Sequence, residues 1–296
     1  MKASSLAGLI RVWTLPMTVS LILLGASYAS FLGLKINFAT LLLALFGSLL
    51  LHAGANVLND VNDVVKGVDS PRSPTAAYRE HPVLHGEIGK RSAVMLSYLL
   101  VASGLLTGVV ITFLTGPAVF LLELAGALAL FSYNGPILDL KAKGFGEFLV
   151  STVWGPLFVM GGFSASAAGR LSFYSFLISI PSALIMMAVI YSNNYRDIET
   201  DIAAGVRSFA YRTRSLSNFI YTACIFGAYA LQLLYIIFGT FPLSTLVSFF
   251  TIPYAASLPK KFSKKLIDID AKTGLLFTAY NFLIVAGLFN RLENAA

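Results

Sequence analysis

Long apolar stretches alternate with short polar segments along almost the whole chain. Nine of these stretches approach the ~20 residues that an apolar helix needs to cross the hydrocarbon core of a bilayer. They lie at about 8–32, 38–58, 92–114, 117–134, 146–168, 172–194, 216–239, 242–258 and 273–290, the fourth and eighth being the shortest. The pattern therefore predicts an all-α, polytopic membrane protein with nine transmembrane helices.

Positively charged residues are distributed unequally between the two sides of this predicted bundle. With nine spans, 18 of the 21 Lys and Arg residues fall on the side of the N-terminus, and Lys35, Arg170 and Arg291 fall on the other. Cytoplasmic loops are enriched in Lys and Arg. We therefore expect a multi-pass protein of the cell membrane whose N-terminus and longer polar loops face the cytoplasm.

The overall composition agrees with extensive contact to lipid. Hydrophobic residues make up 57% of the chain and charged residues 12%, against about 25% charged residues in soluble domains. The net charge of +7 follows from topology and from contact with anionic lipid, so we predict no nucleic-acid partner. The single cysteine, Cys224, lies within a predicted span, which excludes a disulfide within the chain.

We interpret residues 1–296 as a single transmembrane domain without a separate soluble domain. The longest polar segment, about 59–91, contains Pro71, Pro74 and Pro82, which interrupt any long helix. Loops of this length in compact structures are often functional, so the segment can form a cytoplasmic cap over a site or remain a mobile connector. A second cytoplasmic motif loop is expected at 195–215.

Two acid-rich motifs follow the second and sixth predicted spans, on the same side of the membrane. The first reads Asn56-Val57-Leu58-Asn59-Asp60-Val61-Asn62-Asp63, with Lys66-Gly67 and Asp69 just beyond. The second reads Asn193-Asn194-Tyr195-Arg196-Asp197-Ile198-Glu199-Thr200-Asp201. Both contain Asn-x-x-x-Asp, a weak repeat with parallel orientation. Together they hold six carboxylates, which are costly beside hydrocarbon.

Each motif can point its oxygen atoms toward one side of a helix. At ~100° per residue, Asn56, Asp60 and Asp63 stay within about 60° of one another, and Asn193, Asp197 and Asp201 spread over about 80°. Mg²⁺ prefers oxygen ligands, typically one or two carboxylates with water and phosphate oxygens. We therefore predict that these two asparagines and four aspartates face a central cavity open to the cytoplasmic side, where they bind Mg²⁺ and a diphosphate. The alternative is a solvated acidic helix end.

Basic residues accompany these acids along the sequence. Lys66 and Arg72 follow the first motif, Arg207 follows the second, and Lys141 lies in the loop between them. Such cations stabilise the charge that develops on a departing diphosphate. For Lys66, Lys141 and Arg207 we favour diphosphate binding over a purely topological role, whereas the lysines at 260–265 suit lipid headgroups.

Four more side chains are candidates for the site. His52 lies one turn before Asn56 and should face the same cavity, where it contacts an acceptor or is an internally hydrogen-bonded histidine. Glu123 lies in the middle of the fourth span, and an intramembrane carboxylate is a functional candidate by default. Tyr133 and Tyr195 are embedded in polar motifs, and aromatic faces stabilise cations, including a carbocation.

These motifs resemble the UbiA superfamily of intramembrane aromatic prenyltransferases, and the similarity extends over nearly the whole chain. The segment Asn56-x-x-Asn59-Asp60-x-x-Asp63-x-x-Lys66-Gly67-x-Asp69 is similar to the branch that acts on 1,4-dihydroxy-2-naphthoate in menaquinone synthesis. So are Asn193-Asn194-Tyr195-Arg196-Asp197-x-Glu199-x-Asp201, Gly144-Phe145-Gly146-Glu147 and the opening Arg11-Val12-Trp13-Thr14-Leu15-Pro16. In contrast, Gly205-Val206-Arg207-Ser208 departs from that branch, and the segment from Tyr133 to Lys141 resembles chlorophyll-synthase and archaeal lipid branches.

The resemblance implies a reaction and a set of site residues. A prenyl diphosphate would be ionised with Mg²⁺ as cofactor, and an electron-rich aromatic ring would attack the allylic cation. The implied catalytic residues are Asp60, Asp63, Asp197, Asp201, Lys141 and Tyr133. The implied substrate-binding residues are Asn56, Lys66, Arg72, Asn193, Tyr195, Arg207, Arg11 and His52, and the metal ligands are Asn56, Asp60, Asp63, Asn193, Asp197 and Asp201.

Other functions remain compatible with the sequence. Within the superfamily, the acceptor can instead be 4-hydroxybenzoate, haem, a chlorophyll precursor or an archaeal glycerol lipid. Outside it, a cation-coupled membrane transporter is the main competitor, because transporters also bind ions within helix bundles. The nearly uncharged midplane and the placement of both motifs on one face favour the transferase.

Overall fold

The computed structural model describes residues 3–135 and 137–289, and these residues contain no β-strand. Pro136 and residue 290, the expected end of the ninth span, lie outside the described residues. The helices, in chain order, are α1 (Ala3–Ile10), η1 (Val12–Thr14), α2 (Leu15–Phe31), α3 (Phe38–Val65), α4 (Pro74–Tyr78), α5 (Lys90–Thr115), α6 (Ala118–Tyr133), α7 (Gly146–Thr152), η2 (Val153–Leu157), α8 (Phe158–Ser166), α9 (Phe173–Arg196), α10 (Ile198–Ala203), α11 (Phe209–Arg212), η3 (Arg214–Leu216), α12 (Ser217–Ile237), η4 (Leu243–Thr251), α13 (Ile252–Ser263) and α14 (Ile269–Phe289).

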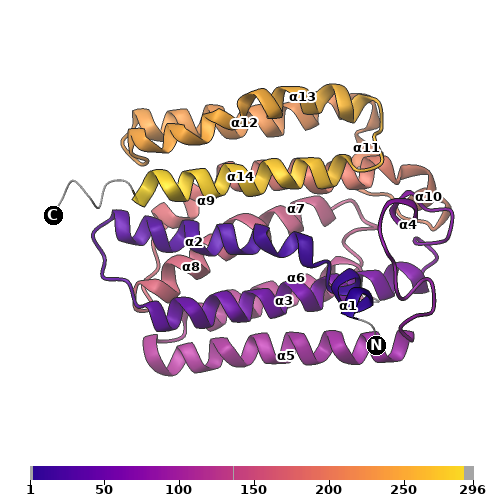
Figure 1. The fold of residues 1–296 in the computed structure, drawn as a ribbon, viewed down its shortest axis with the longest axis horizontal. Coiled ribbons are helices and arrows are strands. Elements are labelled where there is room, and N and C mark those ends of the chain that lie inside the picture. The colour runs from indigo at the N-terminus through magenta and orange to yellow at the C-terminus, as the bar shows by residue number, and fades with distance from the viewer. Residues whose placement is uncertain (1–2, 136, 290–296) are drawn as a thin grey trace.

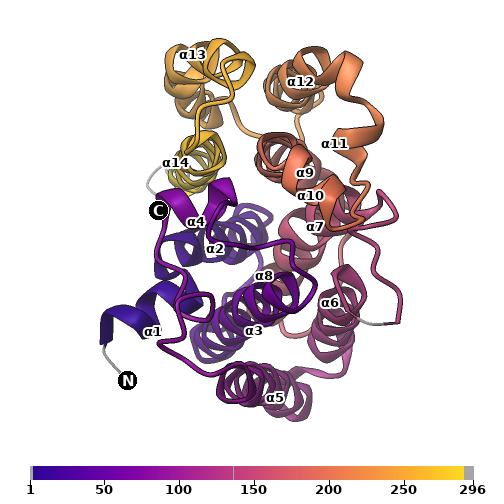
Figure 2. The same cartoon turned by 90° about the vertical axis from the view of Figure 1, so that its right-hand side faces the viewer.

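The long helices lie side by side in one bundle (Figure 1). Helix α3 packs along α5, α2 packs against α8, and α9 packs against α12 and α14. The view along the bundle shows α4 in front of α2, with α14 above it and α3 below it (Figure 2). The short helices α1, α4, α10 and α11 all gather at the same end of the bundle (Figure 1).

The all-helical membrane fold is confirmed, but the count of nine spans is not. Among the described residues, seven helices are long and apolar enough to cross a membrane. The fourth predicted span forms α6, whose 16 residues fall short of the usual ~20. The eighth forms a 3₁₀ helix, η4, that continues into α13 instead of one apolar α-helix.

Local backbone features explain where predicted helices are divided. Arg11 adopts a left-handed backbone with φ of 51°, so the first predicted span is split into α1 and the η1–α2 helix. Pro156 lacks the N–H that an α-helix requires, and the chain around it forms the π-helical turn η2 between α7 and α8. By contrast, α3 continues unbroken to Val65, so its last turns include the whole first motif.

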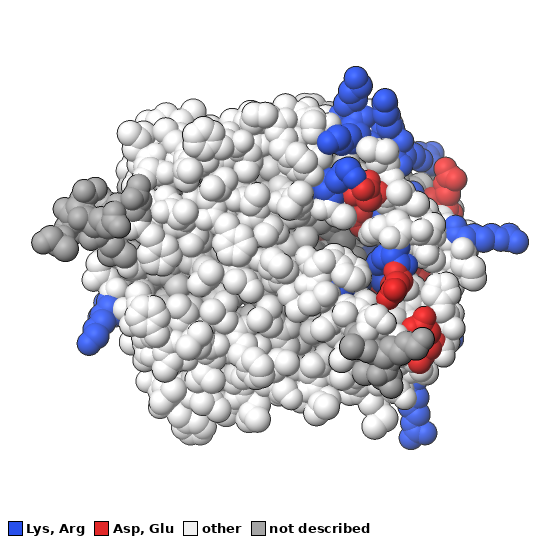
Figure 3. Space-filling model, viewed as in Figure 1, with Lys and Arg blue, Asp and Glu red and all other residues white. Residues whose placement is uncertain are grey.

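Charged side chains gather at one end of the molecule. Figure 3 shows Lys, Arg, Asp and Glu concentrated where α1, α4 and α10 lie, with a wide uncharged belt beside them. This distribution is the one expected for a protein whose apolar belt contacts lipid. Both acidic motifs therefore lie at the charged end of the bundle, at the ends of α3 and α9.

Glycine allows α2 and α8 to approach closely. A Cβ atom built on Gly25 would lie 2.0 Å from the Val159 carbonyl oxygen, and one built on Gly162 would lie 2.2 Å from the Ile22 carbonyl oxygen. Small residues at such crossings are typical of helix pairs in membranes, where close packing stabilises association. This crossing supports the wall of the bundle interior beneath the charged end.

We predict that Gly162→Ala lowers stability because its methyl group must displace α2 backbone. Overpacking of this kind costs about 1–3 kcal/mol. The matched control is Gly161→Ala on the same helix, where an added Cβ has no heavy atom within 4 Å. Thermal unfolding in detergent should show a lower melting temperature for Gly162→Ala alone, and equal melting temperatures would contradict the proposed close crossing.

Candidate functional site

A cavity of about 570 Å³ opens among the helices at the charged end of the bundle and continues into its apolar interior. Its wall combines acidic, basic and amide side chains with apolar residues such as Leu122, Val153 and Met186. Predicted site residues on this wall are Arg11, His52, Asn56, Asp63, Glu123, Tyr133, Lys141, Asn193, Asp197 and Asp201. Both acidic motifs therefore face one shared space.

The first motif reaches the cavity through Asn59, Asp63 and Asp69. The Lys141 ammonium group donates to both Asp63 carboxylate oxygens, at 3.1 and 3.0 Å, and the Asn59 amide donates to one of them at 3.0 Å. Gly67, with φ of +74°, turns the chain so that the Asp69 N–H donates to the Asp63 carbonyl oxygen at 3.0 Å. Asp69 thus lies beside Asp63, although six positions separate them.

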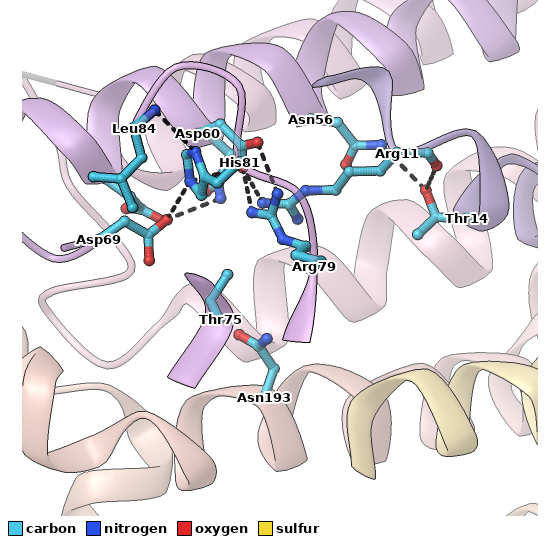
Figure 4. Close-up of polar contacts among 12 residues, drawn as sticks. Arg11, Thr14, Asn56, Asp60, Asp69, Thr75, Arg79, His81, Leu84 and Asn193 are labelled. Carbon is cyan, nitrogen blue, oxygen red and sulfur yellow. Dashed lines mark hydrogen bonds and ion pairs between the residues drawn. The ribbon is translucent and has the colours of Figure 1, made fainter. Parts of the chain in front are cut away.

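Asp60 does not reach the cavity wall, in contrast to the prediction. Its fully buried carboxylate pairs with Arg11 and accepts two hydrogen bonds from Arg79, at 2.7 and 3.1 Å. Figure 4 shows both arginines converging on Asp60, while Asn193 and Thr75 lie across from them. Helical rotation of about 60° between Asp60 and Asp63 allows either to face the cavity, but Arg11 and Arg79 hold the Asp60 carboxylate on their own side.

His81 joins Asp60 to Asp69. Its Nε2 atom lies 3.0 Å from an Asp69 carboxylate oxygen and 3.9 Å from an Asp60 oxygen. Burial favours the neutral acid, but the hydrogen bond and charge of His81 outweigh it and hold the pKa of Asp69 below its usual value. These three side chains lie close enough together to approach one metal ion, but Arg11 and Arg79 already neutralise Asp60, so we interpret Asp60 as part of an ion network.

The second motif contributes Asn193, Asp197 and Asp201 to the opposite part of the wall. The Arg196 guanidinium holds Asp197 through two hydrogen bonds of 2.8 and 2.7 Å, and the Thr75 hydroxyl donates to Asp197 at 3.1 Å. Asp201 Oδ2 is buried and has no hydrogen-bond partner among the described residues. Burial, followed by the nearby Asp197, Asp63 and Asp69 carboxylates, raises the pKa of Asp201 to about 7 against the opposing effect of Lys141.

Lys141 lies between the two halves of the site. It is buried, and burial alone would lower its pKa, but the adjacent Asp63 carboxylate raises the pKa well above the ordinary lysine value. Its backbone N–H donates to the Tyr133 carbonyl oxygen at 2.7 Å, which fixes the loop after α6. A permanently charged lysine at this position suits an anionic ligand.

His52 and Asn56 occupy the wall farther along α3. His52 hydrogen-bonds through its two ring nitrogens to the Thr14 and Thr18 hydroxyls, at 3.2 and 2.8 Å, and packs edge-on against Trp154. The Asn56 amide donates to the Ile10 carbonyl oxygen at 2.9 Å. Both side chains therefore tie α3 to the N-terminal segment, as the internally hydrogen-bonded alternative for His52 predicts.

Four predicted substrate-binding residues do not line the cavity. Lys66 pairs with Asp139 at 2.5 Å, and Arg72 and Arg207 are exposed. Tyr195 stacks on Phe262 and lies beneath the Lys265 ammonium group. The structure thus brings together the acids, Lys141 and Arg11, but leaves these four outside.

Several residues at the site were missed in the sequence. Asn59, Tyr78, Arg79 and Asp270 all line the cavity. Asn59 was visible within the first motif, and its spacing to Asp63 equals that of Asn193 to Asp197, so the repeat begins at Asn59. Arg79 and Asp270 stand in no recognisable motif, and only the fold brings them to the site.

Comparisons with known proteins show the family to which this chain belongs. The model of the UbiA prenyltransferase family matches residues 10–268. The UbiA prenyltransferase domain-containing protein 1 of Danio rerio is 27% identical over 285 residues, which cover 94% of this chain and 82% of that protein. Its homologue in Drosophila melanogaster is 27% identical over 266 residues, or 88% of this chain and 72% of the relative.

Solved structures show the same fold. A structure from work on digeranylgeranylglyceryl phosphate synthase has a TM-score of 0.66 and 20% identity, covering 97% of this chain and 98% of that one. A UbiA homologue from Archaeoglobus fulgidus, bound to GPP and Mg²⁺, has a TM-score of 0.63 and 16% identity, with coverages of 96% and 100%. At these identities the likeness concerns the fold.

The two kinds of carboxylate environment predict opposite effects on stability. Asp60→Asn leaves Arg11 and Arg79 without their buried counter-charge, and loss of one partner of a buried ion pair costs about 3–5 kcal/mol. Asp201→Asn removes a charge that burial and the nearby Asp197, Asp63 and Asp69 carboxylates disfavour, so stability should stay unchanged or rise. Thermal unfolding in EDTA would measure both, and an equal loss in the two variants would refute the assignment of Asp60 to a structural ion network.

Proposed function

Because this chain belongs to the UbiA prenyltransferase family, we propose that it transfers a prenyl group from a prenyl diphosphate to an aromatic acceptor, with Mg²⁺ as cofactor. The observation that carries the proposal is the meeting of both acidic motifs on one cavity, with Lys141 between them. The apolar continuation of the same cavity suits a hydrocarbon chain. The cavity thus has a polar end that suits the diphosphate and an apolar end that suits the prenyl group.

The residues on the wall fit a magnesium ion. Asp63 and Asp69 from the first half, with Asp197 and Asp201 from the second, offer the carboxylate oxygens that Mg²⁺ prefers, and the Asn59 and Asn193 amides stand beside them. The buried Asp201 Oδ2 has no hydrogen-bond partner in the described chain and lies on the same wall as these carboxylates, so it is available to a cation. When bound, Mg²⁺ supplies positive charge that neutralises the diphosphate.

Basic side chains complete the proposed diphosphate site. Lys141, Arg79 and Arg11 all line the cavity. We propose that Lys141 binds the diphosphate while the C–O bond between the prenyl group and the diphosphate breaks. A fixed cation stabilises the negative charge that develops on the leaving oxygen. Arg11 and Arg79 are already bound to Asp60. They therefore contribute to the electrostatic potential inside the cavity and to its shape.

We propose 1,4-dihydroxy-2-naphthoate as the acceptor. The support is the resemblance of the first motif, with Lys66-Gly67-x-Asp69, to the naphthoate branch. In this reaction the diphosphate leaves with the electron pair of the C–O bond, and the ring carbon that bears the carboxylate bonds to the allylic cation. Loss of carbon dioxide then returns an electron pair to the ring and restores its aromaticity.

The segment around α4 is proposed to act as the cap over this reaction. Thr75 contacts Asp197 of the second motif, and Arg79 contacts Asp60 of the first. A segment fixed at both sides of the cavity excludes water from a reactive carbocation. We further propose that this charged end faces the cytoplasm, as the distribution of Lys and Arg along the sequence indicates.

Removal of the proposed metal ligands should abolish turnover. We expect EDTA to stop diphosphate release from geranyl diphosphate and added Mg²⁺ to restore it. Asp63→Asn and Asp201→Asn should each lose about 10²-fold or more in rate, comparable to other losses of fixed transition-state electrostatics. The control is Glu199→Gln, whose side chain is 89% exposed although it shares α10 with Asp201. Unchanged rates in both aspartate variants would refute the proposed metal site.

The acceptor can be tested directly by mass. Purified protein with Mg²⁺ and geranylgeranyl diphosphate should convert 1,4-dihydroxy-2-naphthoate into a prenylated product that has lost carbon dioxide. Parallel incubations contain 4-hydroxybenzoate or geranylgeranylglyceryl phosphate. Product formation from one of these, with none from the naphthoate, would leave the transferase assignment intact but overturn the proposed acceptor.

A further inference from the structure

Asp270 connects three elements at the edge of the cavity. It lies in the first turn of α14 and lines the same cavity as both motifs. Its Oδ2 atom accepts hydrogen bonds from the Asn193 amide at 3.0 Å and from the Tyr78 hydroxyl at 2.8 Å. Its Oδ1 atom accepts a hydrogen bond from the Arg196 guanidinium at 2.7 Å. One carboxylate thus joins α14 to α9 and to α4.

The contact with Asp270 determines which way the Asn193 amide points. An ionised carboxylate only accepts hydrogen bonds, so the NH₂ group of Asn193 must face Asp270. The amide carbonyl oxygen is then directed away from Asp270, and it accepts no hydrogen bond from the described residues. Because Asn193 lines the cavity, this oxygen is the group that it can offer to a cation.

The Asp270 carboxylate also positions Arg196. Its guanidinium bridges Asp197 and Asp270, donating to each at 2.7 Å, and also donates to the Ile267 carbonyl oxygen at 2.9 Å. Asp197 therefore shares the charge of Arg196 with Asp270 instead of holding it alone. A carboxylate that is only partly neutralised by its resident cation binds an added cation more favourably.

Tyr78 completes the arrangement from the side of α4. Its ring lies beneath the Arg196 guanidinium, with 4.8 Å between the guanidinium carbon and the ring centroid. Burial and the charge of Asp270 raise the pKa of Tyr78 to about 12, although Arg196 opposes the shift. The hydroxyl therefore stays protonated and donates to Asp270 throughout the neutral range.

We propose that Asp270 is a positioning residue for metal binding by the second motif, where it orients the Asn193 carbonyl oxygen and shares Arg196 with Asp197. The proposal rests on the proposed magnesium-dependent function and deepens it, since it names a residue outside both motifs on which metal affinity depends. Mutation of a residue that orients a metal ligand through a hydrogen bond typically lowers metal affinity 10–100-fold. The structure assigns this role to the first turn of the last helix.

The test measures metal binding without turnover. Mn²⁺ serves as the probe and is titrated by electron paramagnetic resonance into purified protein with geranyl diphosphate. Asp270→Asn must turn its NH₂ group toward donors, either Asn193 and Tyr78 or Arg196, and should raise the Mn²⁺ dissociation constant about tenfold or more. The matched control is Asp268→Asn, which removes an equal charge just before the same helix, where Asp268 pairs with Lys272. This control should bind Mn²⁺ as the wild type does.

A double-variant experiment separates positioning from general damage. If Asp270 acts in part through Asn193, Asp270→Asn should raise the dissociation constant by clearly less in an Asn193→Ala background than in the wild type, because coupled residues are not additive and only the effect through Arg196 remains. Asp270→Glu keeps the charge but moves the oxygen atoms, and it should weaken Mn²⁺ binding at a wild-type melting temperature. This variant keeps the test decisive if Asp270→Asn does not fold.

Two results would overturn the role of Asp270. One is wild-type Mn²⁺ affinity in both Asp270 variants, and the other is an undiminished tenfold effect in the Asn193→Ala background. Failure of the proposed function has a different signature. In that case the wild-type protein binds Mn²⁺ with the expected dependence on Asp270 but releases no diphosphate from any prenyl donor.

Discussion

The structure depends on one constraint, which is that a carboxylate that keeps its charge beside hydrocarbon must have a cation. Asp60, Asp63 and Asp197 each meet it with a basic residue at hydrogen-bonding distance, and together they draw Arg11, Arg79, Lys141 and Arg196 to one place. An unpaired buried charge costs several kcal/mol, so these pairs fix the segments that carry them. The same requirement makes the part of the cavity where Asp201 Oδ2 has no hydrogen-bond partner among the described residues receptive to a metal ion.

The two halves of the site satisfy this constraint in different ways. In the first half, the cations come from loops: Lys141 from the segment after α6 and Arg79 from the segment after α4. In the second half, Arg196 comes from the same helix as the motif and is secured by Asp270 of α14. The first half is therefore organised by connecting segments, and the second by helix packing in the bundle.

The sequence predicts the parts of this arrangement that depend on local pattern. Apolar length predicts the membrane helices, and the acid-rich motifs predict a shared polar cavity at one end. It cannot distinguish Asp60 from Asp63, because helical periodicity allows both to face one side within about 60°. The choice between cavity and ion network depends on Arg79, which approaches from a loop whose path no periodicity describes. Asp270 was missed for the same reason, since its partners lie on α9 and α4.

The two motifs each bring a pair of carboxylates to the cavity wall, but by different backbone paths. In the second motif, Asp197 caps the N-terminus of α10 and Asp201 lies one turn into it, where its N–H donates to the Asp197 carbonyl oxygen at 2.9 Å, so this single turn places both on the cavity wall. In the first motif, α3 ends at Val65, and the left-handed turn at Gly67 brings Asp69 back beside Asp63. Glycine adopts that backbone at little cost, whereas other residues are strained there. The spacing of six residues and the glycine within it therefore belong together, and the second carboxylate of this half depends on the turn as well as on the acid.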